Sequence, residues 1–246
     1  MKLLVKALLS LFLLSTYKTL PGAYVIRFYY RAFVTLALTR KKYVSSKKQN
    51  TFGYTGDSKL DIFKPSTYTS YVSPLEIDMF VHKSNSTYFT DLDLARMDLV
   101  LRVFQKYFFQ EFDNDFGTFK SKSVNNFPYA PIAMVECTFK KELKIFQKFE
   151  IKSKVVAWDD KWLFMMSEFK IPKSDRTYAV AMTKYVFKKG GGRTTINPEE
   201  MIERCGMLND EVKAINKENY ELVKHLASTD DLEAMFDKLT SRTSKL

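Results

Sequence analysis

The sequence Leu75-Glu76-Ile77-Asp78-Met79-Phe80-Val81-His82-Lys83-Ser84-Asn85-Ser86-Thr87-Tyr88 connects an extended segment to a helical pattern that continues to about Phe109. Ser84, Asn85 and Ser86 are all favoured N-cap residues, so the helix should begin on one of them. Asp78 comes just before it, which aims a carboxylate at the free N–H groups of the first helical turn. Such amides could hold a developing oxyanion while the carboxylate acts as a base or a nucleophile.

The segments around this stretch predict an α+β fold. One face of the helix is apolar at spacings of three and four residues, with Tyr88, Leu92, Ala95, Leu99 and Val103, so this helix should be buried. The strand-like segments are 67–72 before the helix and 132–139, 149–158, 162–171 and 177–187 after it. Short polar turns separate the last three segments and require antiparallel hairpins, because a parallel crossover needs a dozen or more residues.

Composition limits the classes of function. The 246 residues are 46% hydrophobic and 15% aromatic, which suits one substantial core. The 39 Lys and Arg against 28 Asp and Glu give a net charge of +11, so anionic partners are favoured. Two cysteines and two histidines form no zinc pattern, and we predict no metal and no cofactor. No nucleic-acid-reading motif and no G-x-S-x-G serine hydrolase motif occur.

The N-terminal region is basic and apolar. Residues 1–56 contain no Asp or Glu, and two apolar runs, 3–14 and 23–38, are separated by Pro21-Gly22. Three interpretations are open: a membrane anchor with an interfacial helix, a mitochondrial targeting sequence, or a cleaved secretory signal. We expect residues 1–40 to contact a membrane surface or bilayer, with the mitochondrion favoured and the endoplasmic reticulum as the alternative. A helix that simply packs on the core is the remaining possibility.

Composition shifts divide the chain into four parts. These are a hydrophobic and basic N-terminal region at 1–44, a polar linker at 45–66, the main domain at 67–192 and a helical C-terminal extension at 193–246. The triple glycine before Arg193 ends the last predicted strand. Asn197 and Pro198 then form a typical helix start.

The loop and the order of elements resemble the hot-dog-fold acyl-CoA thioesterases of the 4-hydroxybenzoyl-CoA thioesterase-like branch. That branch has an Asp, a His four residues on, Asn at six and seven, and Tyr at ten; this chain has Asp78, His82, Ser84, Asn85 and Tyr88. The tract 76–96 and the turn 158–160 (Trp-Asp-Asp) are also similar to membrane-anchored proteins of the thioesterase superfamily member 6 type. Two departures are Val81, where many relatives have Gly, and Ser84 in place of the first Asn.

The resemblance implies hydrolysis of a fatty or aromatic acyl-CoA thioester and a role in lipid metabolism. Asp78 would be the base or nucleophile, helix amides near Asn85 would polarise the carbonyl, and His82 would orient the loop. Ser84 and Tyr88 would contact substrate, and Arg193 or the lysines between 140 and 154 would meet the phosphates of coenzyme A. Relatives build their sites between two protomers, so a homodimer is expected.

An alternative is a hot-dog protein without chemistry that binds acyl chains or serves as a membrane-associated interaction module. Each site residue also has a structural interpretation. Asp78 could cap a turn, His82 could be a structural loop histidine, and Tyr88 could be a core or pocket-wall aromatic.

Overall fold

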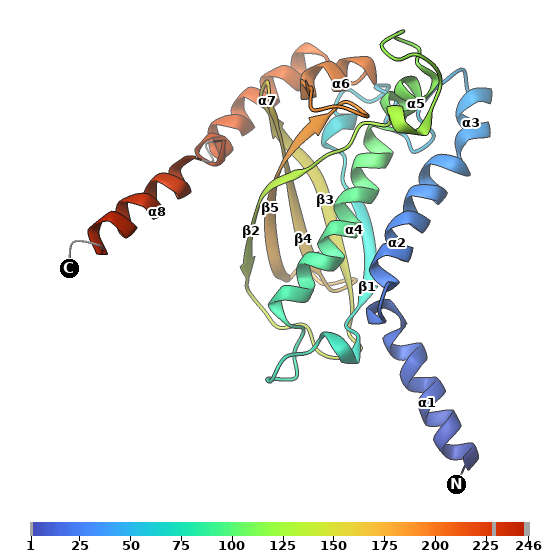
Figure 1. Ribbon diagram of the computed structural model, residues 1–246, viewed down its shortest axis with the longest axis vertical. Helices are drawn as coiled ribbons and strands as arrows, with labels where there is room; N and C mark the ends of the chain where they lie inside the picture. Colours follow the sequence, from blue (N-terminus) through green and yellow to red (C-terminus); the bar gives the residue numbers. More distant parts are fainter. Residues whose placement is uncertain (1, 228–229, 244–246) are drawn as a thin grey trace.

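The computed structural model describes residues 2–227 and 230–243, which contain all of its described helices and strands. Its centre is a six-stranded antiparallel sheet in the order β1-β3-β4-β5-β2, with β6 paired to β5 (Figure 1). The strands are β1 (Ser66–Tyr71), β2 (Ile132–Phe139), β3 (Lys148–Trp158), β4 (Trp162–Lys170), β5 (Thr177–Lys188) and β6 (Thr195–Ile196). The antiparallel hairpins predicted from the short turns are confirmed.

A long helix, α4 (Asn85–Val103), lies along one face of this sheet (Figure 1). All five apolar positions predicted for its inner face are buried: Tyr88, Leu92, Ala95, Leu99 and Val103. The inward positions of β3 alternate in the same way, with Phe149, Ile151, Ser153 and Val155 buried and the lysines between them exposed. This arrangement of one buried helix against an antiparallel sheet is the predicted α+β hot-dog fold.

The helical pattern extends past α4 but does not continue as one helix. The backbone turns at Phe104 (φ −96°, ψ 19°), and a separate helix, α5 (Gln105–Asp113), follows. Phe104 is completely buried and packs edge-on against Phe187 of β5. Apolar periodicity passes through the break because both helices face the same core.

The segment 45–66, predicted to be a polar linker, packs against the core instead. Tyr54 and Ile62 are buried within it, and Asn50 donates a hydrogen bond to the backbone oxygen of Arg102 at 2.6 Å. A Cβ on Gly56 would lie 1.9 Å from the backbone oxygen of Gly206, so the segment also contacts the loop after α6 (Pro198–Arg204). Its polar side chains satisfy buried backbone groups, which composition alone does not reveal.

The C-terminal extension begins inside the same core. Ile196, Met201 and Ile202 are buried there, and α7 (Asp210–Val223) packs on β3. The final helix, α8 (Asp230–Thr243), extends away from the sheet (Figure 1). Residues 228–229 and 244–246 of the predicted extension lie outside the described part of the chain.

The N-terminal region is helical, with α1 (Lys2–Thr16), α2 (Ala23–Ala32), a π-helical turn at Phe33–Ala37 and α3 (Arg40–Ser45). α2 packs along α4, whereas α1 projects from the molecule with its apolar side chains exposed (Figure 1). Among the described residues no single helix has the length and hydropathy to cross a membrane. The pair Lys2–Thr19 and Ala23–Ser45, bent by 60°, meets that test together by length and composition.

Candidate active site

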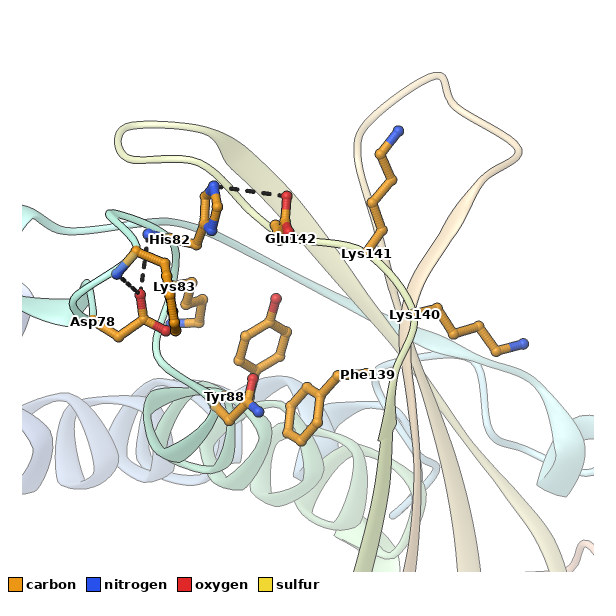
Figure 2. A pocket seen from close by; sticks show the side chains of 10 residues that line it. Asp78, His82, Lys83, Tyr88, Phe139, Lys140, Lys141 and Glu142 are labelled. Atoms are coloured by element: carbon orange, nitrogen blue, oxygen red, sulfur yellow. Dashed lines mark hydrogen bonds and ion pairs between the residues drawn. The ribbon is translucent and has the colours of Figure 1, made fainter.

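The loop that carries Asp78 is a tight reversal between β1 and α4. Asp78 Oδ1 accepts hydrogen bonds from the backbone N–H of Phe80 at 2.9 Å and of His82 at 3.4 Å (Figure 2). The Asp78 N–H in turn donates to the His82 carbonyl at 2.9 Å. The carboxylate therefore shapes its own loop, as the structural interpretation of Asp78 predicts, and it does so at an exposed position.

Val81 takes the left-handed conformation that glycine would adopt at no steric cost, with φ of 63°. Its N–H donates to the Asp78 carbonyl at 3.0 Å, which closes the turn. The departure from glycine therefore leaves the backbone path of the loop in place, at the energetic cost of a β-branched residue in this region.

The two ends of the loop, Glu76 and Lys83, enter a buried cluster of charges. Lys83 Nζ lies 3.2 Å from Glu76 Oε1 and 2.9 Å from Asp91 Oδ2 of α4. Lys18, from the 3-10 turn Tyr17–Thr19 after α1, contacts Glu76 at 2.8 Å and Asp91 at 3.0 Å. Arg27 of α2 reaches Asp91 at 3.3 Å. The N-terminal region is thus bonded directly to the base of the Asp78 loop.

The cluster holds three cations and two carboxylates, and its charges determine which groups stay ionised. Burial disfavours a charged Asp91, but the charges of Lys83 and Lys18 outweigh burial and lower the pKa of Asp91 to about 2. Burial also lowers the pKa of Lys18, and the attraction of Asp91 and Glu76 offsets only part of that effect. Asp91 therefore stays ionised, whereas the charged form of Lys18 is disfavoured.

A pocket of about 460 Å³ opens beside the loop. Its walls come from the loop, the first turn of α4 and the segment after β2; they are Asp78, Phe80, His82, Lys83, Asn85, Tyr88, Phe139, Lys140, Lys141 and Glu142 (Figure 2). His82 Nε2 lies 3.6 Å from Glu142 Oε2 across it. The pocket thus combines two carboxylates, an imidazole, two exposed lysines and three aromatic rings.

Tyr88 forms the buried wall of this pocket. Its ring packs edge-on against Phe139 with centroids 5.0 Å apart. Burial raises the pKa of Tyr88 well above its usual value, and a backbone hydrogen bond with Leu143 offsets part of the effect. Tyr88 therefore stays neutral at physiological pH and offers an apolar ring.

The N-terminus of α4 faces the same pocket through Asn85. The first amides of a helix have no intrahelical acceptor. Ser84 N–H is used, since it donates to the Glu76 carbonyl at 2.7 Å, and Thr87 N–H donates to the Ser84 carbonyl at 2.9 Å. The amides of Asn85 and Ser86 are the groups in this turn that could receive an anionic oxygen.

The structure brings four of the six predicted site residues together: Asp78, His82, Asn85 and Tyr88 all line the pocket. Ser84 lies at the helix N-cap, where its hydroxyl pairs with Ser86 Oγ at 3.0 Å. Arg193 does not join them within one chain. It follows the far end of β5, whereas the pocket lies beside Phe139, which pairs with Ala179 near the start of that strand.

Several residues of the site have no local signal in the sequence. Phe139 and Glu142 come from a segment more than fifty residues after Asp78, and long-range pairing, such as that of Lys83 N–H with the Leu143 carbonyl at 2.9 Å, brings them there. Lys18 is as distant on the other side. Among the described residues, no group of three or more His, Cys, Asp or Glu side chains is arranged to hold a metal ion.

The sequence of this chain is similar to those of known thioesterases. Residues 72–209 match the family model described as the thioesterase-like superfamily. The chain is 37% identical over 221 residues to the "Probable thioesterase YBR096W" of Saccharomyces cerevisiae, covering 88% of this chain and 86% of that protein. It is 27% identical over 126 residues to the protein THEM6 of Xenopus laevis, covering 50% and 53% of the two chains.

Among solved structures, a hypothetical protein of Thermus thermophilus matches with a TM-score of 0.45 and 16% identity, over 59% of this chain and 98% of that one. The family model spans the Asp78 loop, α4 and all the strands after it. The high coverage of the yeast relative extends the similarity over most of the remaining chain. The chain therefore belongs to the thioesterase-like superfamily, as a thioester hydrolase with the hot-dog fold.

Proposed function

We propose that the protein hydrolyses a fatty or aromatic acyl-CoA thioester and that Asp78 is the catalytic carboxylate. The observation that carries this proposal is the shared pocket: Asp78 and the N-terminus of α4 line the same cavity, with Lys140 and Lys141 at its wall. Asp78 Oδ1 holds the loop together. Among the described residues Oδ2 has no hydrogen-bond donor, so it is the oxygen available for chemistry.

The reaction follows from these positions. Asp78 Oδ2 accepts a proton from water while the water oxygen bonds to the thioester carbonyl carbon, and the amides of Asn85 and Ser86 bind the resulting oxyanion. Collapse breaks the carbon–sulfur bond, and the departing thiolate takes up the proton to give free coenzyme A and a carboxylic acid. In the nucleophilic variant, Asp78 attacks the carbonyl carbon and expels the coenzyme A thiolate; water then cleaves the acyl anhydride, which releases the carboxylic acid, regenerates the Asp78 carboxylate and provides a proton for the thiolate.

The other wall residues have supporting roles in this proposal. His82, paired with Glu142, holds the loop and the segment after β2 together, and Phe80, Tyr88 and Phe139 offer apolar surface to the acyl group. Lys140 and Lys141, rather than Arg193, bind the phosphates of coenzyme A.

We further propose that the protein acts as a membrane-associated homodimer. β2 is an edge strand of the sheet, and half of its residues are exposed, which leaves room for a second copy. Residues 1–40 would attach it to a membrane. The acid-free composition of residues 1–56 favours a mitochondrial membrane, with the endoplasmic reticulum as the alternative.

The test compares Asp78→Asn with wild type and with Asp159→Asn, using release of free thiol from a panel of acyl-CoAs. Asp159 is a matched control, because its Oδ1 also accepts two loop amides, from Lys161 at 2.8 Å and Trp162 at 2.7 Å, at the opposite end of β3. We expect Asp78→Asn to lower kcat by about 100-fold or more and Asp159→Asn to leave it unchanged.

The second candidate is an acyl-binding protein without chemistry. It is favoured by the exposed position of Asp78 and by the use of Oδ1 in the turn. If wild type and Asp78→Asn have the same negligible rate while acyl-CoA still binds, this alternative replaces the enzyme.

A further inference from the structure

The tip of the Asp78 loop is apolar and projects into solvent. Met79, Phe80 and Val81 are 86%, 67% and 57% exposed, although each is a large hydrophobic side chain. Three consecutive side chains of this kind form a contiguous apolar patch, which on a soluble surface marks a site of interaction. Phe80 also lines the pocket, so the patch borders its mouth.

A second apolar side chain lies at the same end of the molecule. Phe146, in the connection between β2 and β3, is 57% exposed. Its N–H donates to the Val72 carbonyl at 2.9 Å, and the neighbouring Lys144 pairs with His82 in an isolated antiparallel bridge. These backbone bonds hold the two loops together, so their apolar tips belong to one surface.

α1 leaves the molecule from this end as well (Figure 1). Its last turn is fixed there, because Tyr71 Oη donates to the Ser15 carbonyl at 2.8 Å and the hydroxyls of Thr19 and Ser73 lie 3.0 Å apart. The exposed apolar side chains of α1 are Leu3, Leu4, Val5, Leu8, Leu9, Leu11, Phe12, Leu13 and Leu14. No other part of the described chain covers these side chains, so an apolar environment would be favourable for them.

Basic side chains surround this end. The segment 139–148 carries four exposed lysines, Lys140, Lys141, Lys144 and Lys148, against the single acid Glu142. α1 adds Lys2 and Lys6 and has no acidic residue. Apolar tips beside a group of exposed lysines complement an anionic bilayer, in which apolar groups enter the acyl boundary and lysines meet the headgroups.

We propose that Met79, Phe80, Val81 and Phe146 insert into an anionic lipid bilayer beside α1, so that the mouth of the Asp78 pocket faces the membrane. The membrane contact then includes the catalytic loop and is not confined to residues 1–40. One consequence rests on the proposed function: an acyl-CoA would reach the pocket from the bilayer surface. The docking itself does not depend on turnover.

The experiment uses the full chain, and it places a tryptophan at the loop tip with Phe80→Trp. The control is Leu222→Trp. Leu222 is 74% exposed in α7, whose Asn219 donates a hydrogen bond to the Val156 carbonyl near the end of β3 that lies farthest from the loop. Wild-type fluorescence, from buried Trp158 and half-buried Trp162, is subtracted.

With vesicles of phosphatidylcholine and phosphatidylserine, we expect the emission of the tryptophan at 80 to shift to the blue and to be quenched by brominated lipids. The tryptophan at 222 should do neither. Quenching should weaken at high salt and without phosphatidylserine. A tryptophan at 80 that behaves like the one at 222 overturns the proposal. A blue shift without quenching by brominated lipids also overturns it, because a protein surface then covers the tip.

A second measurement uses Met79→Ser combined with Phe146→Ser, neither of which lines the pocket. The partition coefficient onto these vesicles should fall about tenfold or more, while Leu222→Ser leaves it unchanged. Neither readout requires hydrolysis. A protein that docks but releases no thiol contradicts the proposed function alone, and an active protein whose loop is not quenched contradicts this inference alone.

Discussion

Val81 is the residue of the candidate site where side chain and backbone conformation conflict most. Its φ of 63° is unfavourable for a β-branched residue by about 1–2 kcal/mol. Val81→Gly removes that strain. Glycine loses more backbone entropy on folding than valine does, but this loss costs somewhat less free energy than the strain. We expect the free energy of unfolding to rise by up to about 1 kcal/mol, measured by urea denaturation.

The matched control is Val44→Gly. Val44 is equally exposed but lies in α3, where glycine should lower the stability by about 1 kcal/mol. If both variants lose stability alike, the strain at Val81 is not real.

Lys18 provides a second prediction for a single residue. Its ammonium group is almost fully buried between Glu76 and Asp91, at 2.8 and 3.0 Å. Lys18→Met leaves two buried carboxylates short of a partner, and we expect a loss of about 3 kcal/mol in the free energy of unfolding. Lys48→Met is the control, because Lys48 forms a half-exposed pair with Asp115 at 2.7 Å, which should contribute no more than about 1 kcal/mol. Equal losses in the two variants would contradict this role for Lys18.

Among the elements, those with a strong local pattern could be predicted from the sequence. The first part of β3 alternates between buried and exposed residues, and short turns join β3, β4 and β5, so the strands and their pairing follow from the chain. The break at Phe104 could not be predicted, because α4 and α5 turn apolar residues to one core. Segment 45–66 resembles a linker in its polar composition, but its polar groups form hydrogen bonds to the protein rather than to water. Asp61 Oδ2, for example, accepts hydrogen bonds from the N–H groups of Thr55 and Gly56.

The buried cluster joins four parts of the chain, namely the turn after α1, α2, the ends of the Asp78 loop and α4. The pKa of Asp91 is lowered because Lys83 and Lys18 outweigh its burial. A carboxyl with a lowered folded pKa stabilises the fold above its unfolded pKa of about 4 and loses that contribution as pH falls toward the folded value. We expect the free energy of unfolding to drop by about 2 kcal/mol between about pH 4 and pH 2 on account of Asp91.

Urea denaturation across this acid range measures the effect, with Asp91→Asn as the comparison. The variant should be less stable at neutral pH, and its stability should depend less steeply on pH. An unchanged acid slope in Asp91→Asn would assign the loss to other carboxyls.

At the scale of the whole molecule, the sequence predicts those site residues that lie together in one continuous stretch. Asp78, His82, Asn85 and Tyr88 lie within eleven residues, and the fold keeps them together. Arg193 was assigned by charge and by the glycines beside it, but a strand of twelve residues separates the two ends of β5. Sequence shows that a charge lies near a strand end without showing which end faces the pocket. To predict that residues 139–142 form a wall of the pocket, one must know the order of strands in the sheet, and local sequence patterns do not give that order.

The core of the whole molecule contains many tyrosines, and this predicts its behaviour in alkali. Burial raises the pKa of Tyr54 to about 12, and it raises the pKa of Tyr107 and Tyr185 further still. Burial likewise raises the pKa of the Cys205 thiol to about 12. A group with a raised folded pKa contributes stability that is complete below its unfolded pKa and is lost as pH rises toward the folded value.

The unfolded pKa is about 10 for tyrosine and about 8.5 for cysteine, so the loss begins near pH 9 and steepens above pH 10. Each such group then removes about 1.4 kcal/mol per pH unit. Lys18 acts in the opposite direction up to about pH 10.4, since its folded pKa is lowered, but it is one group against several. We therefore expect cooperative alkaline unfolding, measured by urea denaturation and by the ultraviolet absorbance of tyrosinate.

Two variants isolate the contribution of a single ring. Tyr54→Phe removes a buried phenol and should reduce the alkaline slope by about one proton, whereas Tyr29→Phe removes an exposed phenol and should leave the slope unchanged. Tyrosinate absorbance from Tyr54 should appear only together with unfolding, because ionisation within the fold would place an unpaired charge in the core. If its absorbance rises near pH 10 in a protein that remains folded, water reaches that part of the core, and the burial on which this argument depends is incorrect.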